Sequence, residues 1–284
     1  MKELGDQTGA DWTEMAKIYK QLTVTISAKP IGSLLSRLDE LHPFSKAIGV
    51  HDNGCGPGPI ISRVIQDYGS QLPKDCVLSA SDFSPAMIEQ VEGTKKEEVE
   101  KDAGSLWGRV ETSVLDAMDL KGIPDDSRSH ITAGWVYFMT PDPQKCLSES
   151  KRVLATDGVL GCSSWKGSQW LEIMRLVEVI KPERKMMEIP KAWMEKEGIK
   201  GELEKAGFTD VESREVEVEM TIEEYEPFLD LMTSKMPHMI AITKDYSEEE
   251  MKRLRDMMLA KLKEYSPTLP GKLYGTSLVA FGRK

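Results

Sequence analysis

Apolar runs of strand length alternate with segments of helical periodicity over the first two thirds of the chain. Each predicted strand is followed by a turn and then by a segment whose apolar residues recur every three or four positions. The pattern predicts strands at 47–51, 76–80, 109–115, 131–136 and 158–163, and helices at 59–68, from Pro85 onward, and at 142–154. Strands that alternate with helices are typical of a mostly parallel sheet with helices on both faces.

The last third of the chain has a different pattern. Helices are predicted at 170–180 and 199–206, strands at 211–220 and 277–281, and two further helices begin at the capping boxes of Thr221 and Ser247. We therefore expect an α/β fold with a doubly wound, mostly parallel seven-stranded sheet, helical cap insertions and an antiparallel C-terminal strand. The expected divisions are an N-terminal helical segment, a core, a helical cap insertion and a final core strand, at 1–45, 46–218, 219–272 and 273–284.

Composition and charge narrow the class of protein. The chain has 284 residues, of which 40% are hydrophobic, and no apolar run approaches the roughly 20 residues of a membrane span. The net charge of −10 disfavours a nucleic-acid partner. The first residues lack the basic and then apolar pattern of a secretory signal, so no such signal is predicted. The widely spaced cysteines favour reduced thiols in a cytoplasmic protein. We also expect a monomer or homodimer. The four cysteines and four histidines show no metal-ligand spacing, so no metal is expected.

The segment from Asp52 to Gly58 carries the clearest chemical signal, because it joins a predicted strand to a predicted helix. Its spacing is acid-x-Gly-x-Gly-x-Gly, which differs from the Gly-x-Gly-x-x-Gly of dinucleotide enzymes. No Lys-Ser or Lys-Thr pair follows the glycines, so a phosphate-binding loop is not predicted. A carboxylate at Asp52 suits an ammonium group and repels phosphate. The alternative interpretation is an ordinary tight turn between a strand and a helix.

Two more acids follow the next predicted strands. Asp82 ends the second strand, where a carboxylate accepts hydrogen bonds from ribose hydroxyls, and Asp116 ends the third, where it suits the exocyclic amine of adenine. Each acid taken alone is also a plausible turn residue. The three acids together describe a ligand with an amino group, a ribose and an adenine, and without phosphate.

These segments resemble the Rossmann-like, class I S-adenosylmethionine-dependent methyltransferases. The resemblance lies in Asp52–Gly58, Asp82–Met87, Asp116–Ala117, Leu147–Gly158 and Ala206–Val211. The amino-acid sequence of the first segment particularly resembles that of fungal secondary-metabolism methyltransferases that act on small molecules. The resemblance implies that S-adenosyl-L-methionine is the cofactor. The residues it implies for binding the cofactor are Tyr19, Asp52, Asn53, Gly54, Gly56, Gly58, Asp82, Phe83, Met87, Asp116, Ala117 and Trp135.

Several later residues are candidates for the acceptor site. A pocket for an apolar substrate is predicted from Trp135, Trp165, Met232, Met236 and Met239, and His238 is the candidate general base. Core packing is the alternative for the tryptophans and methionines, and a surface or packing position is the alternative for the histidine. For Phe83, the alternative to contact with the cofactor is a position in the hydrophobic core. For Tyr19, the alternative is that its helix merely packs on the edge of the sheet.

The resemblance implies transfer of a methyl group to oxygen, nitrogen or sulfur of a small, largely apolar metabolite. A second hypothesis is a cofactor-binding scaffold that regulates a partner or catalyses a reaction other than methyl transfer. A nucleic-acid or protein methyltransferase is disfavoured by the net charge of −10. It is also disfavoured because Val136–Met139 stands where such enzymes carry an Asn/Asp-Pro-Pro-Tyr/Phe string.

Overall fold

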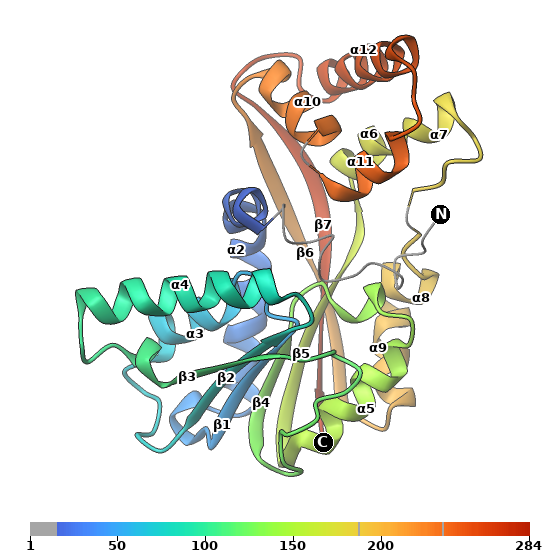
Figure 1. Ribbon diagram of the computed structural model, residues 1–284. Coiled ribbons are helices and arrows are strands. Elements are labelled where there is room, and N and C mark those ends of the chain that lie inside the picture. The colour runs from blue at the N-terminus through green and yellow to red at the C-terminus, as the bar shows by residue number, and fades with distance from the viewer. Residues whose placement is uncertain (1–15, 187, 235) are drawn as a thin grey trace.

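A seven-stranded sheet organises the chain (Figure 1). The computed structural model describes residues 16–186, 188–234 and 236–284, and it describes only the backbone of residues 16–25, 237 and 238. The strand order is β3-β2-β1-β4-β5-β7-β6, in which β1 to β5 pair in parallel and β7 is antiparallel to both neighbours. The strands are β1 (Gly49–Asn53), β2 (Val77–Asp82), β3 (Val110–Val114), β4 (Arg128–Ala133), β5 (Leu154–Ser168), β6 (Thr209–Ile222) and β7 (Gly271–Arg283). The predicted fold class is confirmed.

Helices cover both faces of this sheet. One group, α2 (Ala16–Leu41), α3 (Pro59–Tyr68) and α4 (Pro85–Lys101), encloses the first core cluster together with β1 and β2. The second group, α5 (Pro143–Val153), α8 (Lys191–Met194) and α9 (Lys196–Lys205), packs on the other face over a second cluster. Short 3₁₀ turns lie at η2 (Phe44–Lys46), η3 (Leu106–Arg109) and η4 (Tyr137–Met139). Among the described residues, no helix has the length and apolarity that crossing a membrane requires.

A cap of five helices sits on an extension of three strands. β5 pairs with β4 only as far as Cys162 and continues to Ser168 against β7, which also pairs with β6. Figure 1 shows the cap helices gathered at the far end of these long strands. They are α6 (Gln169–Met174), α7 (Val177–Ile180), α10 (Tyr225–Ser234), α11 (Pro237–Thr243) and α12 (Glu248–Tyr265). Their buried side chains form a third core cluster together with residues of β6 and β7 and with Ile26 of α2.

Two of the predicted boundaries are wrong. Thr221 does not cap a helix, because it pairs with Lys272 in the β6–β7 ladder and the helix begins at Tyr225. The capping box at Ser247 is present, and it starts α12. The fourth strand ends at Ala133 and does not reach residue 136, because Trp135 has a left-handed φ of 57° that an extended strand does not contain.

The contact between α2 and the sheet depends on a glycine of β5. A Cβ added at Gly161 would lie 3.0 Å from Leu38 Cδ1 and 3.1 Å from Leu34 Cγ, and both leucines are fully buried. We expect Gly161→Val to lower the free energy of unfolding by about 1–3 kcal/mol, because overpacking displaces the helix.

The matched control is Gly201→Ala in α9, where a Cβ meets nothing within 4 Å. It should raise the free energy of unfolding by about 0.5–1 kcal/mol. Thermal denaturation measures both, and an unchanged melting temperature for Gly161→Val would contradict the described packing.

Candidate active site

A pocket of about 210 Å³ lies at the carboxyl ends of β1, β2 and β4. Parallel sheets bind ligands at this edge, where the order of the strands reverses on either side of β1. Eight residues that the sequence predicts for the cofactor line the pocket. They are Gly54, Gly56, Asp82, Phe83, Met87, Asp116, Ala117 and Trp135.

The turn between β1 and α3 forms one wall of the pocket. Gly54 and Gly56 both adopt left-handed φ angles, 69° and 53°, which favour glycine. A Cβ on Gly54 would lie 2.5 Å from Val136 Cγ2, so this glycine permits a close approach of two loops. A Cβ on Gly56 would meet nothing within 4 Å. Gly56 therefore leaves open space beside the backbone, where a ligand has room to contact the main chain. Gly58 adopts φ 87° before α3 and does not line the pocket.

Asp82 ties the glycine turn to the end of β2. Its Oδ2 accepts a hydrogen bond from the Gly56 amide and its Oδ1 accepts one from the Ser84 amide, both at 2.9 Å. The residue is only 7% exposed, and burial raises the pKa of its carboxyl group while these amides oppose the rise. A carboxylate oxygen accepts more than one hydrogen bond, so Asp82 retains acceptor capacity toward the pocket.

Asp52 and Asn53 lie beneath the glycine turn and do not line the pocket. Asp52 Oδ1 accepts a hydrogen bond from Thr132 Oγ1 at 2.7 Å, while Oδ2 has no partner among the described residues. Burial raises the pKa of Asp52 to about 7. Asn53 Nδ2 lies 3.5 Å from the Ala117 carbonyl and 3.4 Å from the Tyr137 hydroxyl. In the described structure both residues support the walls of the pocket from behind.

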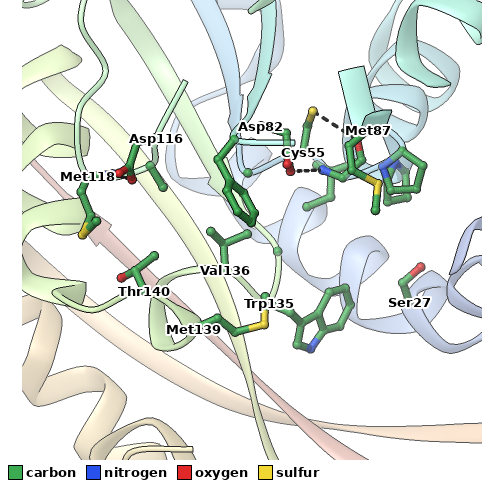
Figure 2. Close-up of a pocket in the computed structure, with 18 of the residues that line it drawn as sticks. Ser27, Cys55, Asp82, Met87, Asp116, Met118, Trp135, Val136, Met139 and Thr140 are labelled. Carbon is green, nitrogen blue, oxygen red and sulfur yellow. Dashed lines mark hydrogen bonds between the residues drawn. The ribbon is translucent and has the colours of Figure 1, made fainter. Parts of the chain in front are cut away.

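The two ends of the pocket differ in chemistry. Figure 2 shows Asp116 and Met118 at one end, Trp135 and Ser27 at the other, and Asp82 between them. Asp116 is exposed, and its Oδ1 accepts a hydrogen bond from the Met118 amide at 2.8 Å. Among the described residues no hydrogen bond reaches its other carboxylate oxygen, which is thus available beside Ala117. This end suits an exocyclic amine, and the binding of adenine here stays a prediction.

The opposite end is aromatic. The left-handed backbone of Trp135 is held by a hydrogen bond from its amide to Ser163 Oγ at 3.0 Å. Its indole stacks on Trp165 at 5.3 Å between ring centroids, and Trp165 meets Trp170 edge to face at 5.4 Å. Only Trp135 of these three lines the pocket. The other two connect it to the core of the cap.

Eleven lining residues were not predicted. Val136, Met139, Thr140 and Pro141 follow β4 in the chain, so the general rule that sites lie beyond the carboxyl ends of strands is the signal that predicts them. Ser27 comes from α2, and no feature of the sequence marks it. The unpredicted lining residues are Ser27, Cys55, Pro57, Pro59, Ile60, Met118, Gly134, Val136, Met139, Thr140 and Pro141.

The structure does not bring the predicted methionines to the pocket. Met232 and Met239 are buried in the third core cluster, and Met236 packs against it. Met232 belongs to α10 and Met239 to α11, and both face the core of the cap, which is the core-packing alternative that the sequence leaves open. Tyr19 and His238 have side chains outside the described part of the chain, so their predicted roles remain predictions.

The pocket fits S-adenosylmethionine. Its described lining contains the carboxylates of Asp82 and Asp116 and no lysine, arginine or histidine. Such a lining accepts hydrogen bonds from a ribose and an amine and offers no counter-charge to a phosphate. Gly56 leaves room for a ligand against the main chain. Within the described residues, no cluster of three or more histidine, cysteine or acidic side chains has the geometry of a metal site.

Comparisons with known proteins agree with this geometry. A family model described as "Methyltransferase domain" matches residues 51–162. Methyltransferase ucsB of Acremonium sp is 42% identical over 272 residues, which cover 96% of this chain and 94% of that relative. Methyltransferase tpcH of Aspergillus fumigatus is 26% identical over 246 residues, covering 82% of this chain and 83% of the relative.

A solved structure shows the same fold. Phosphoethanolamine N-methyltransferase 2 of Haemonchus contortus, in complex with S-adenosyl-L-methionine, superposes with a TM-score of 0.53 at 15% identity. The match covers 99% of this chain and 60% of that one. The strand order and the acid-lined pocket thus define a Rossmann-like, nucleoside-binding domain. Because the identity to ucsB extends over nearly the whole of both chains, the chain belongs to the S-adenosylmethionine-dependent methyltransferase family.

The raised pKa of Asp52 predicts a pH-dependent stability. An unfolded Asp52 ionises near its ordinary pKa of 3.8, whereas the folded one stays protonated to about 7. Stability is therefore lost as the pH rises through this window, by up to about 4 kcal/mol at 1.36 kcal/mol per pKa unit. We expect Asp52→Asn to remove this loss, so its melting temperature relative to wild type should increase from pH 5 to pH 8.

The exposed Asp75→Asn is the matched control, and its melting temperature should stay parallel to that of wild type. Thermal denaturation between pH 5 and pH 8 measures both differences. A constant difference for Asp52→Asn over this range would show that the carboxyl group is not protonated in the folded protein.

Proposed function

We propose that this methyltransferase transfers the methyl group of S-adenosylmethionine to an oxygen, nitrogen or sulfur atom of a small, largely apolar metabolite. The observation that carries the proposal is the composition of the pocket at the strand ends. The polar part of the pocket is formed by Asp82 and Gly56. It adjoins an apolar end formed by Trp135, Val136 and Met139. We propose a cytoplasmic monomer or homodimer without a nucleic-acid partner.

Each part of the pocket has a proposed role toward the cofactor. Asp116 and Ala117 hold the adenine, Asp82 accepts hydrogen bonds from the ribose hydroxyls, and Phe83 and Met87 pack on the nucleoside. Gly54 and Gly56 leave the main chain open to the amino-acid portion. Asp52 and Asn53 act from beneath by supporting the turn and the loop that carry these groups. Tyr19 of α2 and Gly58 complete the proposed set.

The cofactor supplies a sulfonium whose methyl group is already activated. The protein's remaining tasks are to position the acceptor and to exclude water, and holding reacting atoms about 3–3.5 Å apart can supply several kcal/mol of the barrier. Trp135 lies at the carboxyl end of β4, beside the apolar end of the pocket. We propose that its indole orients the acceptor, supported by its stack on Trp165.

Proton removal is a separate requirement. Burial raises the pKa of the Cys55 thiol well above its ordinary value, so this lining residue is protonated at neutral pH. A base is needed only for an acceptor that must lose a proton, and His238 remains the proposed candidate. Met232, Met236 and Met239 are proposed to act indirectly, because their packing shapes the cap above the acceptor.

The cofactor site is tested by two substitutions and one control. Gly56→Ala should abolish binding of S-adenosylhomocysteine in calorimetry, because its Cβ would enter the space that we assign to the ligand. Asp82→Ala should weaken binding by about 1.5–3 kcal/mol, the range for hydrogen bonds to a charged group. Gly207→Ala is the control, since Gly207 also has a left-handed φ of 83° but lies outside the pocket. Native affinity in both pocket variants would place the cofactor elsewhere.

The acceptor class is tested with methyl-labelled S-adenosylmethionine and a panel of small phenols, amines and thiols, beside RNA and an unrelated protein. We expect label in at least one organic-extractable small product and none in the macromolecules. Trp135→Ala should abolish the label, whereas the affinity for S-adenosylhomocysteine, for which Trp135 is one of several proposed contacts, should fall only in part. Label in RNA or protein would contradict the proposed substrate class. Cofactor binding without transfer to any acceptor would favour the regulatory or non-methylating alternative.

A further inference from the structure

The wall at the Asp116 end of the pocket is an irregular segment. Residues 115–127 connect β3 to β4 and contain no described helix or strand. Asp116, Ala117 and Met118 of this segment line the pocket. Local hydrogen bonds form turns within it, as where the Met118 amide donates to Asp116 Oδ1 and the Ile123 amide donates to the Leu120 carbonyl. These bonds lie inside the segment and do not attach it to the rest of the fold. The position of the whole segment therefore depends on contacts with its neighbours.

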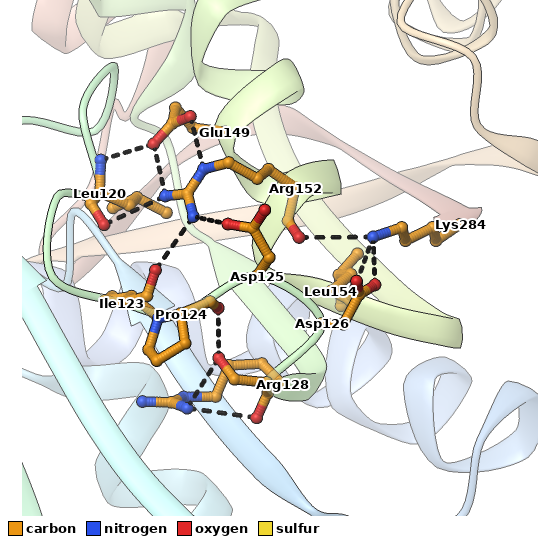
Figure 3. Close-up of polar contacts among 11 residues, drawn as sticks. Leu120, Ile123, Pro124, Asp125, Asp126, Arg128, Glu149, Arg152, Leu154 and Lys284 are labelled. Carbon is orange, nitrogen blue, oxygen red and sulfur yellow. Dashed lines mark hydrogen bonds and ion pairs between the residues drawn. The ribbon is translucent and has the colours of Figure 1, made fainter.

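Arg152 of α5 makes the densest set of these contacts (Figure 3). Its Nη2 donates to the Leu120 carbonyl at 3.2 Å, and its Nη1 donates to the Ile123 carbonyl at 3.0 Å. Nη1 also pairs with Asp125 Oδ1 at 2.6 Å. One guanidinium thus contacts three points of the 115–127 segment. The planar, five-donor shape of arginine suits this arrangement, and lysine cannot reproduce it.

Glu149 completes the arrangement from the same helix. It accepts hydrogen bonds from Arg152 Nε at 2.9 Å and from Nη2 at 2.8 Å, and its Oε2 also accepts the Leu120 amide at 2.9 Å. The Arg152 guanidinium holds the pKa of the Glu149 carboxyl group below its ordinary value, so the pair is ionised at neutral pH. Leu120 is fully buried, and it is hydrogen-bonded to Glu149 through its amide and to Arg152 through its carbonyl.

The same helix also positions another wall of the pocket. Thr140 and Pro141 line the pocket and lie just before α5 in the chain. Ser150 of α5 hydrogen-bonds the Tyr137 hydroxyl at 2.6 Å, and that hydroxyl lies 3.4 Å from Asn53 Nδ2. α5 is therefore attached both to the segment after β4 and, through Arg152, to the segment after β3.

We propose that Arg152 is a positioning residue for the nucleoside end of the cofactor site, acting through the 115–127 segment and without contacting the ligand. This inference rests on the proposed assignment of adenine to Asp116 and Ala117. Loss of the guanidinium removes its hydrogen bonds to the Leu120 and Ile123 carbonyls and its ion pair with Asp125. The segment then samples positions in which Asp116 no longer faces the ligand.

The test compares Arg152→Gln with wild type at a temperature where both are folded. Calorimetric titrations use S-adenosylhomocysteine and 5′-methylthioadenosine, which share the nucleoside but differ in the amino-acid portion. We expect the Kd of both ligands to rise about tenfold, the upper part of the range for residues that act through a network. Arg152→Lys should give an intermediate loss. Arg63→Gln is the matched control, because Arg63 forms a similar surface pair with Asp67 on α3 and does not line the pocket.

Limited trypsin digestion gives a second readout that global destabilisation does not reproduce. Lys121 is exposed within the 115–127 segment. Cleavage after Lys121 should accelerate in Arg152→Gln relative to other sites, and S-adenosylhomocysteine should suppress it. Affinities within twofold of wild type, or a loss confined to S-adenosylhomocysteine, would overturn the inference. Failure of the wild-type protein itself to bind either ligand would instead overturn the proposed cofactor site, and this inference with it.

Discussion

The Asp82 carboxylate joins the two turns on which the ligand pocket depends. Burying a carboxylate is costly unless its oxygens are hydrogen-bonded, and here each oxygen accepts a main-chain amide, from Gly56 and from Ser84. The bond to Gly56 requires the glycine turn to lie against the end of β2, which in turn requires its left-handed φ angles. Asp82 therefore both positions the glycine turn and contributes, with Asp116, to the acidic lining of the pocket.

The parallel strands and the cap have different roles in the fold. The five parallel strands and their helices build the cofactor pocket, whereas β5, β6 and β7 extend past it and carry a cap over the third core cluster. The tryptophan stack from Trp135 through Trp165 to Trp170 bridges the two parts.

Local signals in the sequence predict most of this architecture. Hydrophobic periodicity predicts the strands, their alternation with helices predicts the parallel sheet, and the spacing of glycines and acids predicts one side of the pocket. Long-range strand pairing overrides local signals elsewhere. Thr221, for example, has the sequence pattern of a helix cap but pairs within the β6–β7 ladder. Helical spacing alone does not tell whether Met232 faces a ligand or a core. Ser27 reaches the pocket only through the packing of α2, which no local pattern encodes.

An acidic pocket whose described lining contains no basic side chain should select an S-adenosyl compound over a phosphorylated nucleotide. Calorimetric titration of the wild-type protein with S-adenosylhomocysteine and, separately, with ATP tests it most directly. The two ligands share adenosine, so any difference reports the portion beyond the ribose. The structure predicts saturable binding of S-adenosylhomocysteine and no detectable binding of ATP. Equal affinity for both, or binding of ATP alone, would contradict the account.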